Sequence, residues 1–157
     1  MRLARWVLTN RTALAVVRWL VGLVFLVSAV GKIADPAGFA ESVAAYRILP
    51  NFLVNPFAMV LPWVEVFVGL SLINRISVSG SALLAIVLSF VFLVAVISAM
   101  ARGLDIECGC FTVAKSKVGW ELIARDLILL GMSLVLFLGD AFMERKLGES
   151  VLDKPAV

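Results

Sequence analysis

The two cysteines of the chain lie two residues apart, in the stretch DIECGCFTVAKSK that covers residues 105–117. Cα atoms at this spacing are about 5.5–7 Å apart, near the upper limit for a disulfide. A bond between Cys108 and Cys110 therefore requires a sharp bend, which Gly109 can supply because it has no Cβ atom. So small a ring gains little chain entropy, and strained disulfides are easily reduced. The spacing favours a pair that exchanges electrons over a structural cross-link.

Two other interpretations fit the same spacing. Free cysteine is among the most buried residue types, so both thiols could be reduced, packed and inert. Thiolates also favour soft metals such as Cu(I), and Met59 or Met100 could add a thioether ligand. A lone Cys-X-Cys motif is weak, so spacing alone leaves redox chemistry, inert packing and copper binding open.

Ionisable residues inside apolar segments form a second group: Arg18, Lys32, Glu65, Glu121, Arg125 and Asp126. Such residues are costly in a membrane and usually face the bundle interior with a partner. A pair between Glu65 and Arg125 is expected, with Asp126 turned toward a neighbour such as Lys32. Arg18 is expected to extend to the membrane surface. These charges are either a structural ion-pair lock or a polar pocket in which Glu65 moves the protons that accompany dithiol oxidation.

The composition of the chain indicates whether lipid or water surrounds these residues. Of the 157 residues, 62% are hydrophobic and the mean hydropathy is +1.07, whereas a soluble domain is usually about 45–50% apolar. The chain has no histidine, which removes His-ligated haem and the usual copper and zinc sites, so no metal site is expected. The net charge of +3 comes from Lys and Arg spread over short loops and tails, and no basic cluster indicates nucleic acid. The expected surroundings are a lipid bilayer.

Four apolar runs are each close to the roughly 20 residues that a helix needs to cross the hydrocarbon core. Only helices and closed barrels satisfy their backbone groups in lipid, and these runs are too long for barrel strands. The sequence thus predicts an all-α integral membrane four-helix bundle, one transmembrane domain over residues 1–157. The spans are expected at about 13–33, 56–73, 78–100 and 119–142, with the Cys-Gly-Cys loop at 101–118.

The segment between the first two spans, KIADPAGFAESVAAYRILPNFLVNP, is too polar to cross the membrane. Phe39, Val43, Tyr46 and Leu49 recur at helical spacing, which predicts a short amphipathic helix on the outer face, ended by Pro50. The first span has the length of a signal-peptide core, and its VSA resembles a cleavage site. Because the later spans need a partner helix, we expect it to remain as a helix.

Orientation follows from the Lys and Arg residues at the ends of the spans. Seven lie toward the termini and the turn at 74–77, and five lie on the other side, among them Lys32 and Arg102. This bias predicts cytoplasmic termini and a cysteine loop that faces the periplasm. That compartment permits disulfides.

Three motifs in order resemble the MauE family, within the wider DoxX-like group of four-helix membrane proteins. They are GKIADPAGFAESVAAYRILP after the first span, LPWVEVFVGLSLI in the second, and CGCF between the third and fourth. The family pattern is CGCFG, and here Thr112 replaces the last glycine. The positions that match are Gly31, Lys32, Glu65, Cys108, Gly109, Cys110 and Phe111.

The resemblance implies a bacterial inner-membrane protein linked to periplasmic thiol–disulfide chemistry. MauE proteins are associated with maturation of methylamine dehydrogenase, whose small subunit is rich in disulfides. The resemblance therefore leads us to expect a thiol–disulfide redox protein, of the oxidoreductase type, that serves a periplasmic thioredoxin-like partner or a disulfide-containing client. A quinone is a candidate membrane carrier, because a polar pocket could hold its head group. The alternatives are a non-catalytic assembly factor and a Cu(I)-binding membrane protein.

Overall fold

The computed structural model describes residues 10–103 and 120–152, and the side chains of 10–103 and 122–143. Within these ranges every regular element is a helix: α2 (Arg11–Ala34), α3 (Pro36–Ala45), α4 (Asn51–Asn74), α5 (Val78–Ala101) and α6 (Trp120–Leu152). Four of them, α3 being the exception, are long and apolar enough to cross a membrane. The fold class is confirmed: the chain is a multi-pass helical membrane protein.

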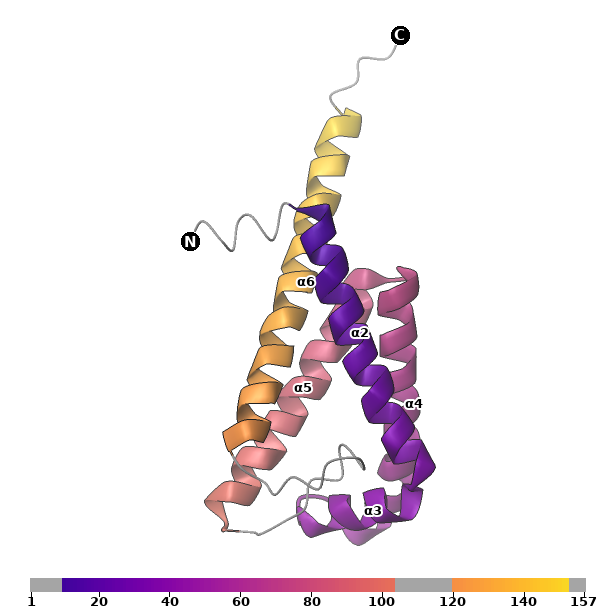
Figure 1. Ribbon diagram of the computed structural model, residues 1–157, viewed down its shortest axis with the longest axis vertical. Helices are drawn as coiled ribbons and strands as arrows, with labels where there is room; N and C mark the ends of the chain where they lie inside the picture. Colours follow the sequence, from indigo (N-terminus) through magenta and orange to yellow (C-terminus); the bar gives the residue numbers. More distant parts are fainter. Residues whose placement is uncertain (1–9, 104–119, 153–157) are drawn as a thin grey trace.

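The four long helices form two closely packed pairs. Helix α2 packs mainly on α4 and α5 packs mainly on α6, while the contacts between the pairs are fewer. In Figure 1 the α4–α5 turn and the start of α2 lie toward one end of the molecule, and α3 lies across the other end. The end of α5 and the start of α6 are also at the α3 end (Figure 1).

Small residues set the close approach within each pair. A Cβ atom on Gly69 would lie 2.9 Å from the carbonyl oxygen of Gly22, so the backbones of α2 and α4 are nearly in contact there. The buried face of α5 is rich in small side chains, among them Ser81, Ala82 and Ala85. In lipid, helices associate through this kind of packing because the hydrophobic effect no longer drives them together. Large apolar side chains such as Val30, Phe67 and Phe90 remain exposed and face lipid.

Helix bounds follow local signals. Asn10 caps α2 by accepting a hydrogen bond from the Thr12 amide at 3.1 Å. Helix α4 begins at Asn51, five residues before the expected start, and takes Pro56 and Pro62 into its interior. Arg75 ends α4 in the left-handed region, at φ 58°, and donates its amide to the Ser71 carbonyl.

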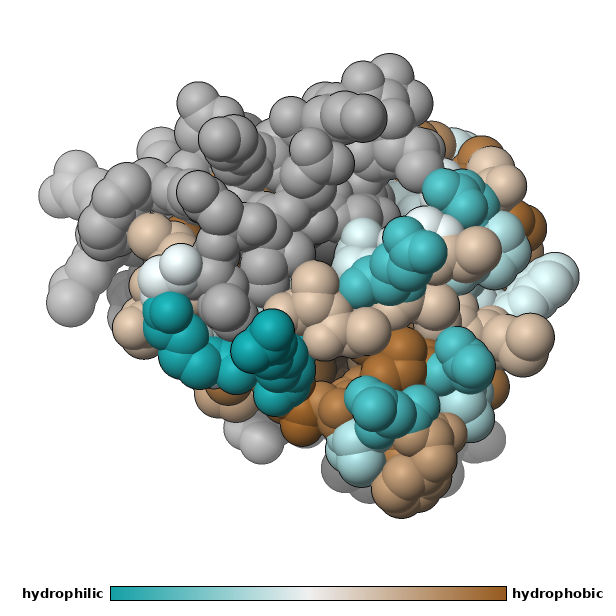
Figure 2. Space-filling view, turned by 90° about the horizontal axis from the view of Figure 1, so that it is seen from below, coloured by the Kyte–Doolittle hydropathy of each residue, from teal (hydrophilic) through white to brown (hydrophobic). Residues whose placement is uncertain are grey.

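The short helix between the first two spans is confirmed and lies across the end of the bundle. Its Phe39 is buried and packs with Ala58 and Leu61 of α4. It ends at Ala45, earlier than the expected stop, because Arg47 turns the chain with a positive φ of 49°. Seen from this end, Figure 2 shows hydrophilic and apolar side chains next to one another on the part of the surface that the structure describes.

Candidate functional site

The cysteine motif lies outside the described residues, as do Gly109 and Phe111. The described chain stops at Gly103, just after α5, and resumes at Trp120, the first residue of α6. Both flanking positions are at the α3 end of the bundle (Figure 1). The site that the structure does describe is a cluster of four charged side chains in the bundle interior, on the inner side of α3: Lys32, Glu65, Arg125 and Asp126.

A buried ion pair joins α2 to α4. The Lys32 ammonium donates to Oε1 of Glu65, and the two side chains are 0% and 2% exposed. Ser28, one turn before Lys32, accepts a second hydrogen bond from the ammonium at 3.0 Å. The second carboxylate oxygen of Glu65, Oε2, is buried without a hydrogen-bond partner among the described residues. A buried acceptor without a partner is costly, so this oxygen is a place where a water or a substrate proton would be bound.

Two aromatic rings enclose the lysine. Its ammonium lies 5.2 Å from the centroid of the Phe39 ring and 4.8 Å from that of Phe92. Both distances are within the range of a cation–π interaction, which strengthens when the cation is desolvated. Because Phe39 belongs to α3 and Phe92 to α5, the rings connect the α2–α4 ion pair to the helix across the end and to the second helix pair.

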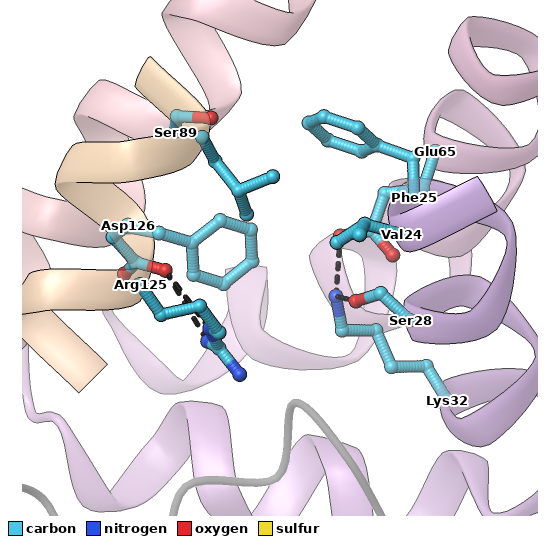
Figure 3. Close-up of a pocket in the computed structure, with 10 residues that line it drawn as sticks. Val24, Phe25, Ser28, Lys32, Glu65, Ser89, Arg125 and Asp126 are labelled. Carbon is cyan, nitrogen blue, oxygen red and sulfur yellow. Dashed lines mark hydrogen bonds and ion pairs between the residues drawn. The ribbon is translucent and has the colours of Figure 1, made fainter. Parts of the chain in front are cut away.

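A second ion pair lies on α6, between consecutive residues. Arg125 Nη2 donates to Asp126 Oδ1 at 3.2 Å, and the side chains are 32% and 6% exposed. Figure 3 shows this pair on one wall of a pocket, with Lys32, Ser28 and Glu65 on the facing wall. These four described charges sum to zero.

The pocket between the two pairs is a cavity of about 30 Å³. Its lining comes from α2, α4, α5 and α6: Val24, Phe25, Ser28, Lys32, Glu65, Ser89, Phe92, Arg125, Asp126 and Leu129. A water molecule needs at least about 10–15 Å³ and two or more polar partners. The buried hydroxyl of Ser89 has no hydrogen-bond partner among the described residues, and neither has Glu65 Oε2. The cavity is therefore suited to one or two waters in contact with a carboxylate, the arrangement that a proton relay uses.

The structure gathers the predicted charged residues but pairs them differently. Glu65 pairs with Lys32 rather than with Arg125, and Asp126 pairs with its own neighbour Arg125. Glu121 is on α6, but its side chain lies outside the described set. The expectation for Arg18 was wrong: its side chain is buried inside the bundle, at 9% exposure, and does not extend to the surface.

Three contributors to the site escaped sequence reasoning: Ser28, Ser89 and Phe92. Ser28 carried a usable signal, because it stands four residues before Lys32 and so shares its helix face. Ser89 and Phe92 lie in an apolar helix whose sequence is nearly uniform around its circumference. The inward face of such a helix cannot be read from periodicity.

Comparison with known proteins agrees with the membrane bundle and its motifs. The family model described as methylamine utilisation protein MauE matches residues 10–139. The chain belongs to the MauE family. The match covers α2 to α5 and most of α6, and it includes both ion pairs as well as the cysteine motif.

Curated MauE proteins from methylotrophic and related bacteria are similar over most of the chain. The Methylophilus methylotrophus protein is 36% identical over 117 residues, which are 73% of this chain and 62% of that protein. The Paracoccus denitrificans protein is 32% identical over 124 residues, 78% of this chain and 67% of its own length. The Methylorubrum extorquens protein is 32% identical over 101 residues and is covered to 54%. This chain thus spans little more than half to two thirds of these relatives. No solved structure matches it significantly.

Proposed function

We propose that this MauE-family chain is a membrane thiol–disulfide exchange protein that acts through Cys108 and Cys110. Among the described residues, the polar cavity beside Glu65 carries this proposal. Its lining includes Arg125 and Asp126 near the start of α6, while Ser89 and Phe92 belong to the middle of α5, so the cavity lies inside the bundle between the two helices that flank the cysteine motif. A buried carboxylate oxygen with no hydrogen-bond partner among the described residues can accept a proton, which is the role that thiol chemistry requires.

The reaction is a transfer of two electrons between two pairs of sulfurs. One cysteine thiolate attacks the disulfide of a periplasmic thioredoxin-like partner or client, and a mixed disulfide forms while one partner thiolate leaves. The second cysteine then attacks the mixed disulfide, which yields the Cys108–Cys110 disulfide and the partner's dithiol. Two protons pass with the two electrons, and Glu65 would accept and return them through water in the cavity. The reverse reaction oxidises the partner by the same steps.

The exchange requires the cysteine motif to face the periplasm from the bacterial inner membrane, with both termini in the cytoplasm. The structure supports the charge argument for this orientation. Lys32 was one of five Lys and Arg residues counted on the outer side, but it is buried in an ion pair, so four remain against seven. The larger bias favours cytoplasmic termini.

In the reverse direction, which leaves Cys108 and Cys110 as a dithiol, a quinone would be the membrane carrier that renews their disulfide, by accepting the two electrons and two protons of the dithiol to become a quinol. The polar cavity has the volume of one or two waters, which is small for a quinone ring. A larger apolar groove of about 360 Å³ adjoins it, between α3, α4 and α5, and Phe39 and Phe92 line both the groove and the surroundings of Lys32. The groove is where a quinone would approach the cluster.

The competing function is a non-catalytic assembly factor. One observation favours it: Lys32 and Glu65 form a buried ion pair that would hold α2 against α4 without any chemistry. Removal of both cysteines separates the two functions, because it abolishes exchange and leaves the charge cluster intact.

The test is thiol trapping in intact cells with a membrane-impermeant maleimide, applied before and after a reductant. We expect labelling only after reduction, which indicates an outward-facing disulfide. The chain has only two cysteines, so the double variant Cys108→Ser, Cys110→Ser is the matched blank. Labelling that requires dissolution of the membrane would refute the orientation. Immediate labelling without reductant would place the resting pair in the dithiol form.

A second experiment captures the partner. The single variants Cys108→Ser and Cys110→Ser each keep one thiol. The variant that keeps the attacking thiol can form the mixed disulfide with the partner but lacks the second thiol that would resolve it. We expect that variant to accumulate a higher-mass species that reductant removes, and the double variant to show none. If neither single variant forms this species and the double variant still supports client maturation, the assembly-factor function is correct.

The names of the relatives concern methylamine utilisation, and we propose the same role for this chain. A methylamine-using bacterium that lacks its own MauE should regain growth on methylamine when it produces this chain. The Cys108→Ser, Cys110→Ser double variant should not restore growth, whereas restoration by that variant would show that the thiols are dispensable.

A further inference from the structure

A second cavity lies at the end of the bundle opposite α3. Its volume is about 90 Å³, and it is lined by Arg11, Leu14, Ala15 and Arg18 of α2, by Arg75 and Val78, and by Leu136, Asp140 and Met143 of α6. It therefore stands between the α2–α4 pair and the α5–α6 pair. Among the described side chains of the lining, three guanidinium groups and one carboxylate contribute charge, an excess of two positive charges. We refer to Arg11, Arg18 and Arg75 with this cavity as the arginine pocket.

Asp140, the one carboxylate among the described lining residues, does not neutralise the three arginines of the pocket. Asp140 Oδ2 accepts a hydrogen bond of 2.6 Å from the Ser79 hydroxyl, which joins α6 to α5. In the part of the chain that the structure describes, Asp140 and Arg18 do not come within the 4.0 Å of an ion pair. Arg75 repels Arg18 while Asp140 attracts it, so the field at Arg18 has opposing contributions.

Arg18 is the unusual member of the pocket. It is more than nine-tenths buried, and its Nε is a buried donor with no hydrogen-bond partner among the described residues. It stands seven residues inside Arg11, about 10 Å along the helix. Arg11 and Arg75, by contrast, are exposed at the rim. A buried donor nitrogen without a partner is costly unless an acceptor oxygen from outside the chain completes it.

We propose that the arginine pocket binds a phosphate group, with Arg18 donating from within and Arg11 and Arg75 from the rim. Guanidinium groups match phosphate oxygens in planar, two-bond geometry. Basic pockets between membrane helices at the cytoplasmic side bind anionic head groups. The phosphate of an anionic phospholipid and free inorganic phosphate share this chemistry. A bound phosphate would connect α2 to the α4–α5 turn and neutralise the positive charge of the arginines that Asp140 does not balance. This inference does not depend on the proposed thiol exchange.

The experiment uses the full chain purified in detergent and native mass spectrometry with two lipids of equal chain length, phosphatidylglycerol and phosphatidylcholine. We expect one phosphatidylglycerol to be retained at concentrations where phosphatidylcholine is lost. Loss of one charge-assisted contact should weaken binding about tenfold in Arg18→Gln and in Arg75→Gln. Arg47→Gln is the matched control, because it removes the same charge from an exposed residue at the opposite end.

Inorganic phosphate distinguishes the two sources. If millimolar phosphate displaces the lipid and raises the unfolding temperature of the native chain but not of Arg75→Gln, the pocket takes soluble phosphate. If phosphate has no such effect and phosphatidylglycerol does, the ligand is the lipid. Equal binding of both lipids, or equal binding by all three variants and the native chain, would overturn the proposal. Should Arg18→Gln fail to fold, Arg75→Gln and Arg11→Gln carry the same comparison, since both residues are exposed at the rim.

Discussion

The two ends of this bundle handle buried charge in opposite ways. At the α3 end, Lys32 and Glu65 form an ion pair across α2 and α4, and the four described charges of the cluster cancel. At the other end, Arg18 is buried almost as deeply, but it faces two more arginines and a carboxylate that is already held by Ser79. The comparison shows that burial alone says little about a charge in a membrane protein. What matters is whether its partner belongs to the chain or has to come from outside.

The largest effect is expected at the α3 end. Glu65→Leu would leave the Lys32 ammonium buried and unpaired, which should lower the free energy of unfolding by about 3–5 kcal/mol. Lys32→Met should cost a similar amount, and the double variant should recover most of the loss because neither charge remains. Unfolding in detergent micelles, monitored by tryptophan fluorescence, measures all three. Single variants within about 1 kcal/mol of the native chain would show that the pair is hydrated.

An effect of intermediate size and opposite sign is expected for Arg18→Met. In detergent without anionic lipid or phosphate, this change removes a buried donor that has no partner in the described chain. The free energy of unfolding should stay unchanged or rise, by up to about 1–3 kcal/mol. The same unfolding assay measures it, with Arg11→Met as the exposed control on the same helix. A loss as large as that of Glu65→Leu would mean that Arg18 is already satisfied within the chain.

The smallest effect is expected for an arginine that is paired but exposed. Arg102 donates from Nη2 to the Tyr46 carbonyl at 2.5 Å and from Nε to the Ser98 carbonyl at 3.1 Å, so it ties the end of α5 to the end of α3. Arg102→Gln should lower the free energy of unfolding by only about 0.5–1 kcal/mol, because water replaces most of what is lost. Arg47→Gln is the control of equal charge. If Arg102→Gln lowered the free energy of unfolding by more than Glu65→Leu does, burial would not be what makes a paired charge important for stability.

The fold could be predicted from the sequence because hydropathy over about 20 residues is a one-dimensional signal. The four spans and the short helix between them follow from it, and most observed bounds differ from the expected ones by no more than five residues; the largest difference is at the end of α6, which continues to Leu152 beyond the expected 142. The start of α4 also differs, since Pro56 looks like a boundary yet is accommodated inside a helix that begins at Asn51. Proline is tolerated in membrane helices when neighbours satisfy the freed backbone groups.

The pairing of charges could not be predicted, because it depends on how each helix is rotated about its axis. Glu65 was expected to pair with Arg125, but α2 faces α4 and brings Lys32 to the carboxylate instead. The same limit explains Arg18, which was expected to extend to the membrane surface, whereas the rotation of α2 places it in the lining of a cavity. The roles of Cys108 and Cys110 lie outside the described residues and remain proposals.

Asp35 is the single residue between α2, which ends at Ala34, and α3, which begins at Pro36. Its amide closes α2 on the Gly31 carbonyl, and its carboxylate accepts the Gly38 amide of α3 at 3.0 Å. Asp35 is thus hydrogen-bonded to both helices that it connects, and it stands three residues after Lys32. A displacement of α3 would therefore be transmitted to the last turn of α2, and Lys32 would move relative to Glu65.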